Sequence, residues 1–280
     1  MIPRPTPRTR LYGLLGHPVA HSLSPAMHNA AFAALGLDAV YLAFDVAPEG
    51  LEAALAGCLA LGVAGLNVTV PHKEAALRLA AEADPTARLV GAANTLVAAE
   101  GGWRAFNTDV AGFARALAED LGYAPQGRRA WIWGAGGAAK AAVVALASGG
   151  AQEIFVMNRN AIRAQDLARA LAPRISPCRL EAVEITAFAP GPGDLLVGAT
   201  PAGLDDGARW PWELGGLPEL AVYDMAYRKG RETALVDQAR AAGHRAASGR
   251  SMLLYQGAEA FRLWTGREAP VAVMTRAMGE

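Results

Sequence analysis

The 280-residue chain has little cysteine, no net charge and no long uninterrupted apolar run. Its two cysteines, Cys58 and Cys178, lie far apart, and a disulfide framework or a thiolate metal site needs more of them. Its 26 basic and 26 acidic residues cancel, so that it lacks the basic footprint of a nucleic-acid-binding protein. The longest apolar run, residues 53–66, is interrupted by glycines and is shorter than the roughly 18 residues that cross a bilayer. We therefore expect a cytoplasmic protein that acts on a small molecule, without nucleic-acid or membrane partners, as a monomer or a homodimer.

Short β-branched or apolar runs alternate with Ala/Leu-rich stretches at helical spacing, which predicts an α/β fold with a largely parallel sheet. Strands are expected at 10–16, 39–46, 65–70 and 93–99, and a regular β/α repeat from residue 129 onward. Ser24 is suited to cap a helix over 24–36. We place the domain junction near residue 109, with one domain over 10–109 and a second over 110–252. The helices at about 253–280 are expected to pack back on the first domain.

A glycine turn follows a predicted strand in "WIWGAGGAAKA" and opens a predicted helix. Gly134, Gly136 and Ala139 have the G-x-G-x-x-G/A spacing, in which small residues let a pyrophosphate approach the amides of the helix N-terminus. The match has the strand and helix context that the motif requires, so it predicts a dinucleotide site. A glycine-rich turn without a ligand is the alternative.

The residues after the next strand indicate which dinucleotide binds. An NAD site usually has an acidic residue there, whereas this chain has Asn158, Arg159 and Asn160, with Arg163 one turn later. A guanidinium pairs with a 2′-phosphate through parallel hydrogen bonds. We therefore predict NADP(H) over NAD(H), the alternative being two solvated charges on a helix.

Lys73 stands directly after the apolar run "GLNVTVP" at what reads as a helix start, where the helix dipole disfavours a cation. Partial desolvation at that place would make the amine a readier proton donor, as the reduction of a ketone requires. Asp109, in the first turn of a helix over 108–121, is the expected partner. The alternatives are a surface lysine and a carboxylate that only caps a helix.

The chain resembles the shikimate dehydrogenase family from about residue 10 to its C-terminus. The resemblance is carried by "GHPVAHSLSPAMHN", "NVTVPHK", "GAANT", "NTDVAGF", "GAGGAAKA", "NRN", "YDMAY" and "QGAEAFRLWTG", in that order. It implies an N-terminal α/β substrate domain, a Rossmann-type doubly wound NADP-binding domain and a cleft between them. It also implies the NADPH-dependent, reversible reduction of 3-dehydroshikimate to shikimate, with Lys73 as general acid and base paired with Asp109.

The resemblance assigns the remaining roles residue by residue. Ser22 and Ser24 are implied to bind the substrate carboxylate, although a helix-capping role alone would also account for Ser24. Positions near the ring hydroxyls are Asn67, Thr69, Asn94 and Gln256, and Tyr227 borders the substrate unless it is an ordinary core aromatic. Cofactor positions are Gly134, Gly136, Gly137 and Ala138 in the glycine turn, Asn158, Arg159 and Arg163 at the adenosine phosphate, and Met225, Gly249 and Met252 at the nicotinamide. No metal is expected, because His17, His21, His28, His72 and His244 have no ligand spacing.

Three places depart from the family's usual pattern. They are Gly198 before "ATP", Arg228 and Lys229 after the tyrosine, and Arg250 and Ser251 before the methionine. These differences leave open a broader quinate/shikimate dehydrogenase or an enzyme for an amino-substituted analogue. A catalytically inactive NADP-binding sensor is the alternative from another class. It would need neither Lys73 with Asp109 nor the serines and asparagines of the first domain.

Overall fold

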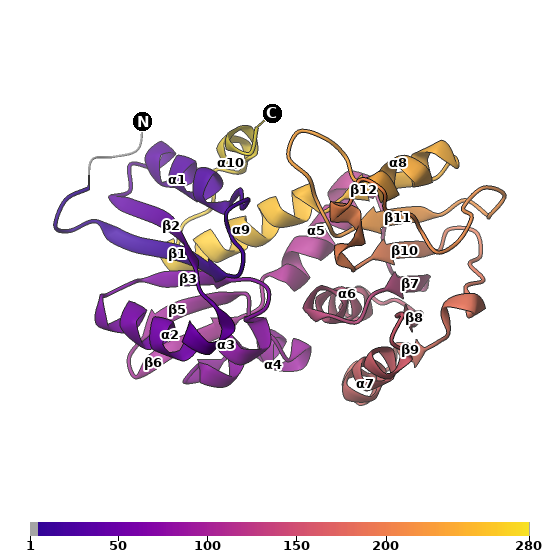
Figure 1. The fold of residues 1–280 in the computed structure, drawn as a ribbon, viewed down its shortest axis with the longest axis horizontal. Coiled ribbons are helices and arrows are strands. Elements are labelled where there is room, and N and C mark those ends of the chain that lie inside the picture. The colour runs from indigo at the N-terminus through magenta and orange to yellow at the C-terminus, as the bar shows by residue number, and fades with distance from the viewer. Residues whose placement is uncertain (1–4, 280) are drawn as a thin grey trace. The chain divides into compact units, whose positions relative to one another are not determined.

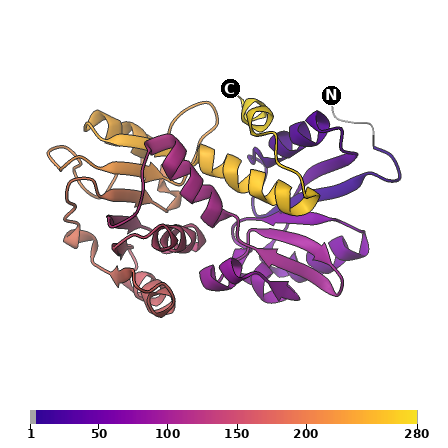
Figure 2. The ribbon, with the colours of Figure 1, turned by 180° about the vertical axis from the view of Figure 1, so that it is seen from behind.

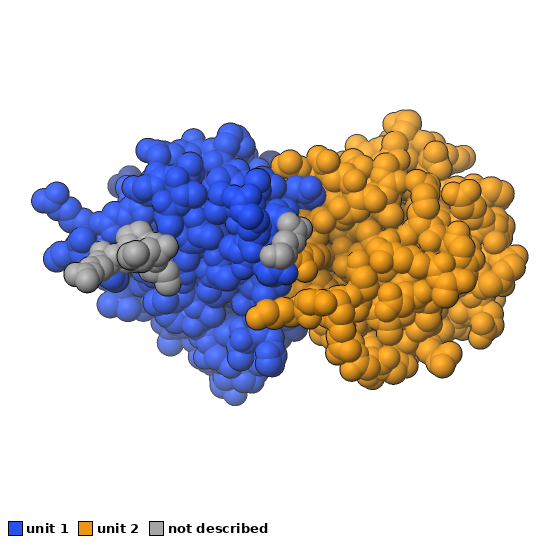
Figure 3. Space-filling model, turned by 90° about the horizontal axis from the view of Figure 1, so that it is seen from above, with its two compact units in different colours: residues 1–108, 253–280 blue, residues 109–252 orange. Residues whose placement is uncertain are grey.

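Two six-stranded sheets, one in each of two units, organise residues 5–279, which the computed structural model describes (Figure 1). The first unit comprises the chain up to residue 108 together with the residues from 253 onward, and the second comprises residues 109–252 (Figure 3). The predicted α/β class, with a largely parallel strand arrangement, is confirmed.

The sheet of the first unit is mixed. Its strand order is β2-β1-β3-β5-β6-β4. The pairs β1–β2, β1–β3 and β4–β6 are parallel, and β3–β5 and β5–β6 are antiparallel. The strands are β1 (Arg10–Gly16), β2 (Ala39–Asp45), β3 (Gly65–Val68), β4 (Glu82–Ala83), β5 (Thr95–Ala99) and β6 (Gly102–Phe106).

Helices from both ends of the chain complete the first unit. They are α1 (Ser24–Ala34), α2 (Leu51–Ala60), α3 (Lys73–Leu79), α4 (Pro85–Val90), the greater part of α9 (Arg250–Thr265) and α10 (Val271–Ala277). In Figure 2, α9 crosses the face of the sheet that is turned toward the viewer. Its Trp264 ring fills the space where a side chain at Gly65 would lie, and Gly257 admits Met27 of α1 in the same way. Two glycines thus let α9 approach a strand and a helix that are far away in the sequence.

The sheet of the second unit is entirely parallel, with the order β12-β11-β10-β7-β8-β9. This is the doubly wound order, in which the chain reverses direction across the sheet between the first strand, β7, and the fourth, β10. The strands are β7 (Arg129–Trp133), β8 (Glu153–Met157), β9 (Arg179–Ala182), β10 (Leu195–Gly198), β11 (Ala221–Asp224) and β12 (Arg245–Ser248). The helices are α5 (Asp109–Leu121), α6 (Gly137–Ser148), α7 (Ala161–Leu171) and α8 (Ala234–Ala241), with the short 3-10 turn η4 (Pro201–Leu204) after β10.

The predicted strands lie within a few residues of the observed ones, but the prediction omitted three strands and placed one helix cap wrongly. The omitted strands are the two-residue β4, then β6, which follows β5 through a tight turn at Gly101, and β9, a four-residue edge strand with charged side chains. Ser24 is not the cap of α1, because the helix already includes it and Leu23 holds the cap position. The hydroxyl of Ser22 accepts a hydrogen bond from the Ser24 amide instead, at 3.2 Å.

No helix within residues 5–279 is long and apolar enough to cross a membrane.

His28 of α1 lies in the core of the first unit with no exposed surface. Its ring stacks on that of Tyr41, with centroids 4.5 Å apart and planes inclined by 13°. Burial lowers the pKa of His28 from 6.5 to about 3, and the Asn67 side chain nearby offsets only a smaller part of this effect. The side chain is therefore neutral in the folded protein at any pH above about 3.

We expect this burial to make the fold sensitive to acid. Below pH 6.5, residue 28 is protonated in the unfolded chain but not in the folded one. The free energy of unfolding therefore falls by roughly 1.4 kcal/mol per pH unit as the pH is lowered to about 3. His28→Phe keeps an aromatic ring in the stack and should lack this part of the slope. The measurement is urea unfolding at pH 7, 6, 5 and 4. The exposed His21, changed to Gln, is the control that should keep the wild-type slope; equal slopes for all three proteins would contradict the expectation.

Candidate functional site

Asn94 is the centre of a buried hydrogen-bond network in the first unit. Its side chain is 2% exposed. Its Oδ1 accepts from the backbone amide of Thr108 at 2.7 Å, and its Nδ2 donates to Thr108 Oγ1 at 3.0 Å and to Gln256 Oε1 at 3.2 Å. One amide thereby holds together the start of β5, the residue that precedes α5, and α9.

Asn67 of β3 continues this network. Its Oδ1 accepts from the Tyr41 hydroxyl at 2.8 Å, and its Nδ2 donates to the Asn94 carbonyl at 3.2 Å and to Thr95 Oγ1 at 3.1 Å. Both amide hydrogens are therefore used inside the protein. Toward a ligand, Asn67 has only acceptor capacity left on Oδ1, so it suits a hydroxyl that donates.

Tyr41 connects Asn67 to the start of α1. The tyrosine is completely buried, and this burial raises its pKa well above 10, while a hydrogen bond with Ser24 acts in the opposite direction. The phenol accordingly stays protonated and keeps its donor role toward Asn67. Ser24 is 4% exposed, and Ser22 lies directly beside it through the bond to the Ser24 amide. The structure thus brings together the predicted residues Ser22, Ser24, Asn67, Asn94 and Gln256.

Lys73 and Thr69 lie on the segment that leaves β3. The Thr69 amide donates to the Leu15 carbonyl at 2.8 Å, which keeps the segment against β1. Lys73 begins α3, as predicted, and its carbonyl accepts from the Ala93 amide at 2.9 Å. The lysine backbone is therefore fixed to the residue that precedes Asn94. Buried His72 supports the turn, since its Nε2 lies 2.7 Å from the Val46 carbonyl oxygen.

Asp109 is the first residue of α5 in the second unit and is 5% exposed. The prediction of a carboxylate in the first turn of this helix is confirmed. The residue before it, Thr108, is held by Asn94 as described above, so the backbone just ahead of Asp109 is fixed. The pairing of Asp109 with Lys73 stays a prediction.

The glycine turn lies at the point where the strand order of the second unit reverses. Gly134 follows β7 with φ +134°, a conformation that favours glycine, and a Cβ there would lie 2.5 Å from the Ala199 carbonyl oxygen after β10. Gly136 holds the cap position of α6, with no atom within 4 Å of where a Cβ would be. Gly137 and Ala138 then begin the helix, whose free amides suit a phosphate anion.

Two arginines follow β8, the strand next to β7 in the sheet. Arg159 and Arg163 are both exposed, and neither forms an ion pair within residues 5–279. Asn160 caps α7 by accepting from the Ile162 amide at 3.1 Å, and Asn158 donates to the Asn160 carbonyl at 2.9 Å. The two asparagines shape the turn, and the two guanidinium groups remain available for an anion.

Met225 and Gly249 lie together where β11 and β12 end. The Met225 amide donates to the Gly198 carbonyl at 2.8 Å, and the Gly249 amide donates to the Ala226 carbonyl at 2.9 Å. The Met225 carbonyl occupies the place that a side chain at Gly249 would need. Met252 follows in the first turn of α9, with 7% of its surface exposed. Tyr227 is half-buried two residues beyond Met225.

The structure accounts for the glycine at position 198. A Cβ at Gly198 would lie 3.0 Å from the Trp210 ring and 3.1 Å from Asp224 Oδ1, so the glycine leaves room for an indole and a carboxylate. Asp224 is completely buried, and burial raises its pKa to about 6, although a hydrogen bond with Thr233 acts in the opposite direction. Ser251 forms a hydrogen bond with Asp120 of α5, whose pKa is raised mainly by burial. Nothing in the structure explains the arginine at position 250.

Several residues of this network have no predicted site role in the sequence. Thr95 and Thr108 lie inside the motifs "GAANT" and "NTDVAGF", so the motifs themselves carried a signal for them. Tyr41 had no such signal, because its role depends on how near β2 lies to β3. Within the described residues, no group of three or more His, Cys, Asp or Glu side chains is placed to hold a metal ion.

The all-parallel doubly wound sheet, with a glycine turn where its strand order reverses, defines a dinucleotide-binding α/β protein. Three protein-family models match the chain. They are described as "Shikimate dehydrogenase substrate binding domain" (residues 14–96), "Shikimate / quinate 5-dehydrogenase" (116–189) and "Shikimate 5'-dehydrogenase C-terminal domain" (249–278). A curated relative from Methanopyrus kandleri, named "Shikimate dehydrogenase (NADP(+))", is 48% identical over 97% of this chain and 96% of its own. The chain belongs to the shikimate dehydrogenase family, which confirms the resemblance seen in the sequence.

Two solved structures illustrate the fold of the family. The shikimate 5-dehydrogenase of Thermus thermophilus in complex with NADP(H) and shikimate is 39% identical, with a TM-score of 0.85, over 96% of this chain and 98% of its own. The quinate dehydrogenase of Corynebacterium glutamicum in complex with NAD is 32% identical, with a TM-score of 0.85, over the same shares of the two chains. The same fold therefore serves two substrates and two cofactors.

We expect Gly134 to be required for folding, whereas Gly136 is not. Gly134→Ala forces a left-handed residue and a contact with a backbone carbonyl, and should lower the free energy of unfolding by about 3 kcal/mol or more. Gly136→Ala meets neither obstacle and should change it by less than ~1 kcal/mol. Denaturant unfolding of the two ligand-free variants beside the wild type is the measurement. An equal decrease in the free energy of unfolding in both variants would show that the close approach of Gly134 to Ala199 is not what requires glycine at position 134.

Proposed function

We propose that the protein is an NADP-dependent shikimate dehydrogenase that catalyses the reversible reduction of 3-dehydroshikimate to shikimate. The observation that carries the proposal is the buried network of neutral amides and hydroxyls around Asn67 and Asn94. Such groups suit a polyol that carries one negative charge, because they match its hydroxyls without adding a charge of their own. The curated relatives named for this activity, which align along almost the whole chain, support it.

The substrate is assigned to the first unit. Ser22 and Ser24 would hold its carboxylate with their hydroxyls. Asn67, with only an acceptor left, would take a hydrogen bond from a ring hydroxyl, and Thr69, Asn94 and Gln256 would contact the remaining ones. Because Asn94 and Gln256 bind each other as well, the hydroxyls meet groups that are already oriented, which lowers the entropy lost on binding.

Lys73 is proposed as the general acid and base. In reduction, its ammonium donates a proton to the substrate oxygen as negative charge develops there; in oxidation, the neutral amine takes up the hydroxyl proton. Asp109 is proposed to pair with the amine and to orient it. Bound NADPH supplies the hydride and NADP+ receives it in the reverse direction.

The cofactor is assigned to the second unit. The amides of the glycine turn, at Gly134, Gly136, Gly137 and Ala138, would receive the pyrophosphate at the start of α6. Arg159 and Arg163 would pair with the 2′-phosphate, beside Asn158. Their exposure and lack of ion pairs in the described chain support NADP(H), because a guanidinium that already holds a carboxylate is a poorer phosphate ligand. Met225, Gly249 and Met252 are assigned to the nicotinamide side.

The domain roles follow from these assignments. Residues 10–109, with the helices at about 253–280, are proposed as the substrate domain and residues 110–252 as the NADP domain, in a cytoplasmic enzyme that needs no metal. A broader quinate/shikimate dehydrogenase is the second candidate, and the similarity to a quinate dehydrogenase supports it. An inactive sensor is less well supported, since it would have no use for Lys73, Asp109 and the polar network together.

Steady-state kinetics with two substrates and two cofactors tests the proposal. We expect kcat/KM to be highest for shikimate with NADP+ and lower for quinate or for NAD+. Each rate is measured as the increase in absorbance of the reduced cofactor. Comparable values for quinate would favour the broader enzyme. Similar kcat/KM with NAD+ and NADP+ would contradict the cofactor assignment, and tight NADP+ binding without turnover would favour the sensor.

Lys73→Ala should remove most of kcat while the affinity for NADP+ is kept, because the amine acts mainly in the transition state. The control is Arg78→Ala, which removes the exposed cation from the other end of the same helix and should keep kcat. Wild-type turnover in Lys73→Ala would exclude the lysine from the chemistry.

A further inference from the structure

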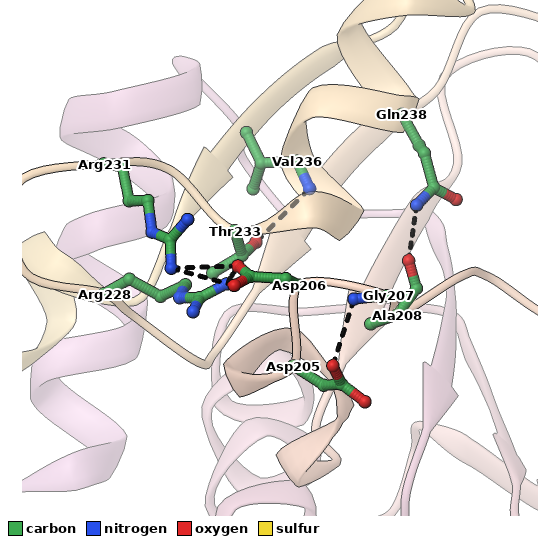
Figure 4. Close-up of polar contacts among 9 residues, drawn as sticks. All are labelled: Asp205, Asp206, Gly207, Ala208, Arg228, Arg231, Thr233, Val236 and Gln238. Carbon is green, nitrogen blue, oxygen red and sulfur yellow. Dashed lines mark hydrogen bonds and ion pairs between the residues drawn. The ribbon is translucent and has the colours of Figure 1, made fainter.

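A three-residue ion-pair cluster of Asp206, Arg228 and Arg231 lies beside the segment that carries Tyr227 (Figure 4). Arg228 donates to Asp206 Oδ1, and Arg231 donates to Asp206 Oδ2 at 3.1 Å and lies 2.9 Å from Oδ1. Two cations thus meet a single carboxylate. Arg228 is one of the departures from the family pattern, so the cluster is a property of this chain.

Arg228 is the desolvated member of the cluster. Its side chain is only 16% exposed, whereas those of Asp206 and Arg231 are 64% and 57% exposed. In other ion pairs the side chain of Arg129 is 36% exposed, and those of Arg179, Arg240 and Arg262 are about half exposed or more. A guanidinium that has lost most of its water depends on its partner, whereas exposed pairs contribute little. The hydrogen bond from Arg228 is the largest cause that lowers the pKa of Asp206, so the carboxylate stays ionised.

Asp206 is presented from a fixed position. It lies just after η4, where the Asp205 amide donates to the Ala202 carbonyl at 2.9 Å and the Gly207 amide donates to Asp205 Oδ1 at 3.0 Å. The Ala208 carbonyl accepts from Gln238 Nε2 of α8 at 2.6 Å. Figure 4 shows the contacts of Gly207 and Ala208 on one side of Asp206 and the two arginines on the other.

Both arginines come from one tight turn. Arg228 and Arg231 form an antiparallel bridge, and Gly230 between them has φ +74°. On the other side of Tyr227, the Ala226 amide donates to Asp224 Oδ1 at 3.2 Å and the Ala226 carbonyl accepts from Gly249. Tyr227 is therefore the one residue between a segment fixed to β11 and β12 and a turn fixed to Asp206.

From this arrangement we infer that Asp206 is a positioning residue, which acts through Arg228 to hold Tyr227 in place beside the substrate. The inference rests on the proposed function, because Tyr227 borders the substrate only if the role that the family resemblance implies for it holds. Without the carboxylate, the turn at 228–231 carries two unpaired cations and one further lysine, and the chain that follows Tyr227 loses its attachment to Asp206. A small displacement of a group that orients the substrate lowers the rate strongly.

A double-mutant cycle with Tyr227→Phe tests the inference. We expect Asp206→Asn to lower kcat/KM for shikimate about tenfold and to change the dissociation constant of NADP+ by less than about threefold. In the Tyr227→Phe background the same change should have little further effect, and Asp206→Glu should restore part of the activity. The control is Glu181→Gln, which removes a carboxylate from the exposed Arg179 on β9 and should leave kcat/KM unchanged.

Three results would overturn the inference: additive losses in the double variant, an equal loss of NADP+ affinity, or a lower KM for shikimate in Asp206→Asn. The last would mean that the released guanidinium binds the substrate itself. Limited trypsin digestion of the ligand-free proteins tests the role of Asp206 without any assumption about the substrate. It therefore separates a failure of the inference from a failure of the proposed function. Cleavage within residues 228–231 should be faster in Asp206→Asn than in the wild type, whether or not shikimate is oxidised; equal rates would show that Asp206 does not hold the turn.

Discussion

The first unit depends on the hydrogen bonds of two buried amide side chains. Asn67 lies in β3 and Asn94 lies directly before β5, which pairs with β3, and their hydrogen bonds reach Tyr41 in β2, Thr95 in β5 and Gln256 in α9. Leaving one such group without a partner in the interior is costly, so each bond restricts where its segment lies. The same restriction orients the polar atoms that a small polyol would meet. On the proposed function, stability and substrate recognition would therefore rest on one set of hydrogen bonds.

The second unit depends on a different constraint, the close approach of two backbones. Gly134 lies against Ala199, and Gly249 lies against Met225, in each case where a strand ends at the carboxyl edge of the sheet. Neither position leaves room for a side chain. Because these approaches occur at the edge where nucleotides bind in doubly wound folds, the glycines shape the backbone surface for a ligand as well as for the sheet.

Much of the fold could be predicted because its pattern is local. Apolar runs bounded by glycine or proline located most strands, and the spacing of Gly134, Gly136 and Ala139 located the glycine turn between β7 and α6. The roles that failed or were missed depend on distances between remote segments. Ser24 was expected to cap α1, but the neighbouring Ser22 hydroxyl reaches the Ser24 amide. Tyr41 meets Asn67 from 26 positions away, and Asp206 meets Arg228 from 22. The local sequence around either residue does not predict that the two side chains are in contact.

The chain order of the first unit has a consequence for synthesis on the ribosome. Residues up to 108 emerge before the second unit, but the ring of Trp264 that packs on Gly65, and Gln256 that binds Asn94, belong to residues 253–280, which follow it. The second unit is continuous from 109 to 252 and has all of its strands before that segment appears. The strands of the first unit are thus made before the second unit, but they acquire their full set of core contacts only after residues beyond 252 have been synthesised, and they stay partly uncovered until then.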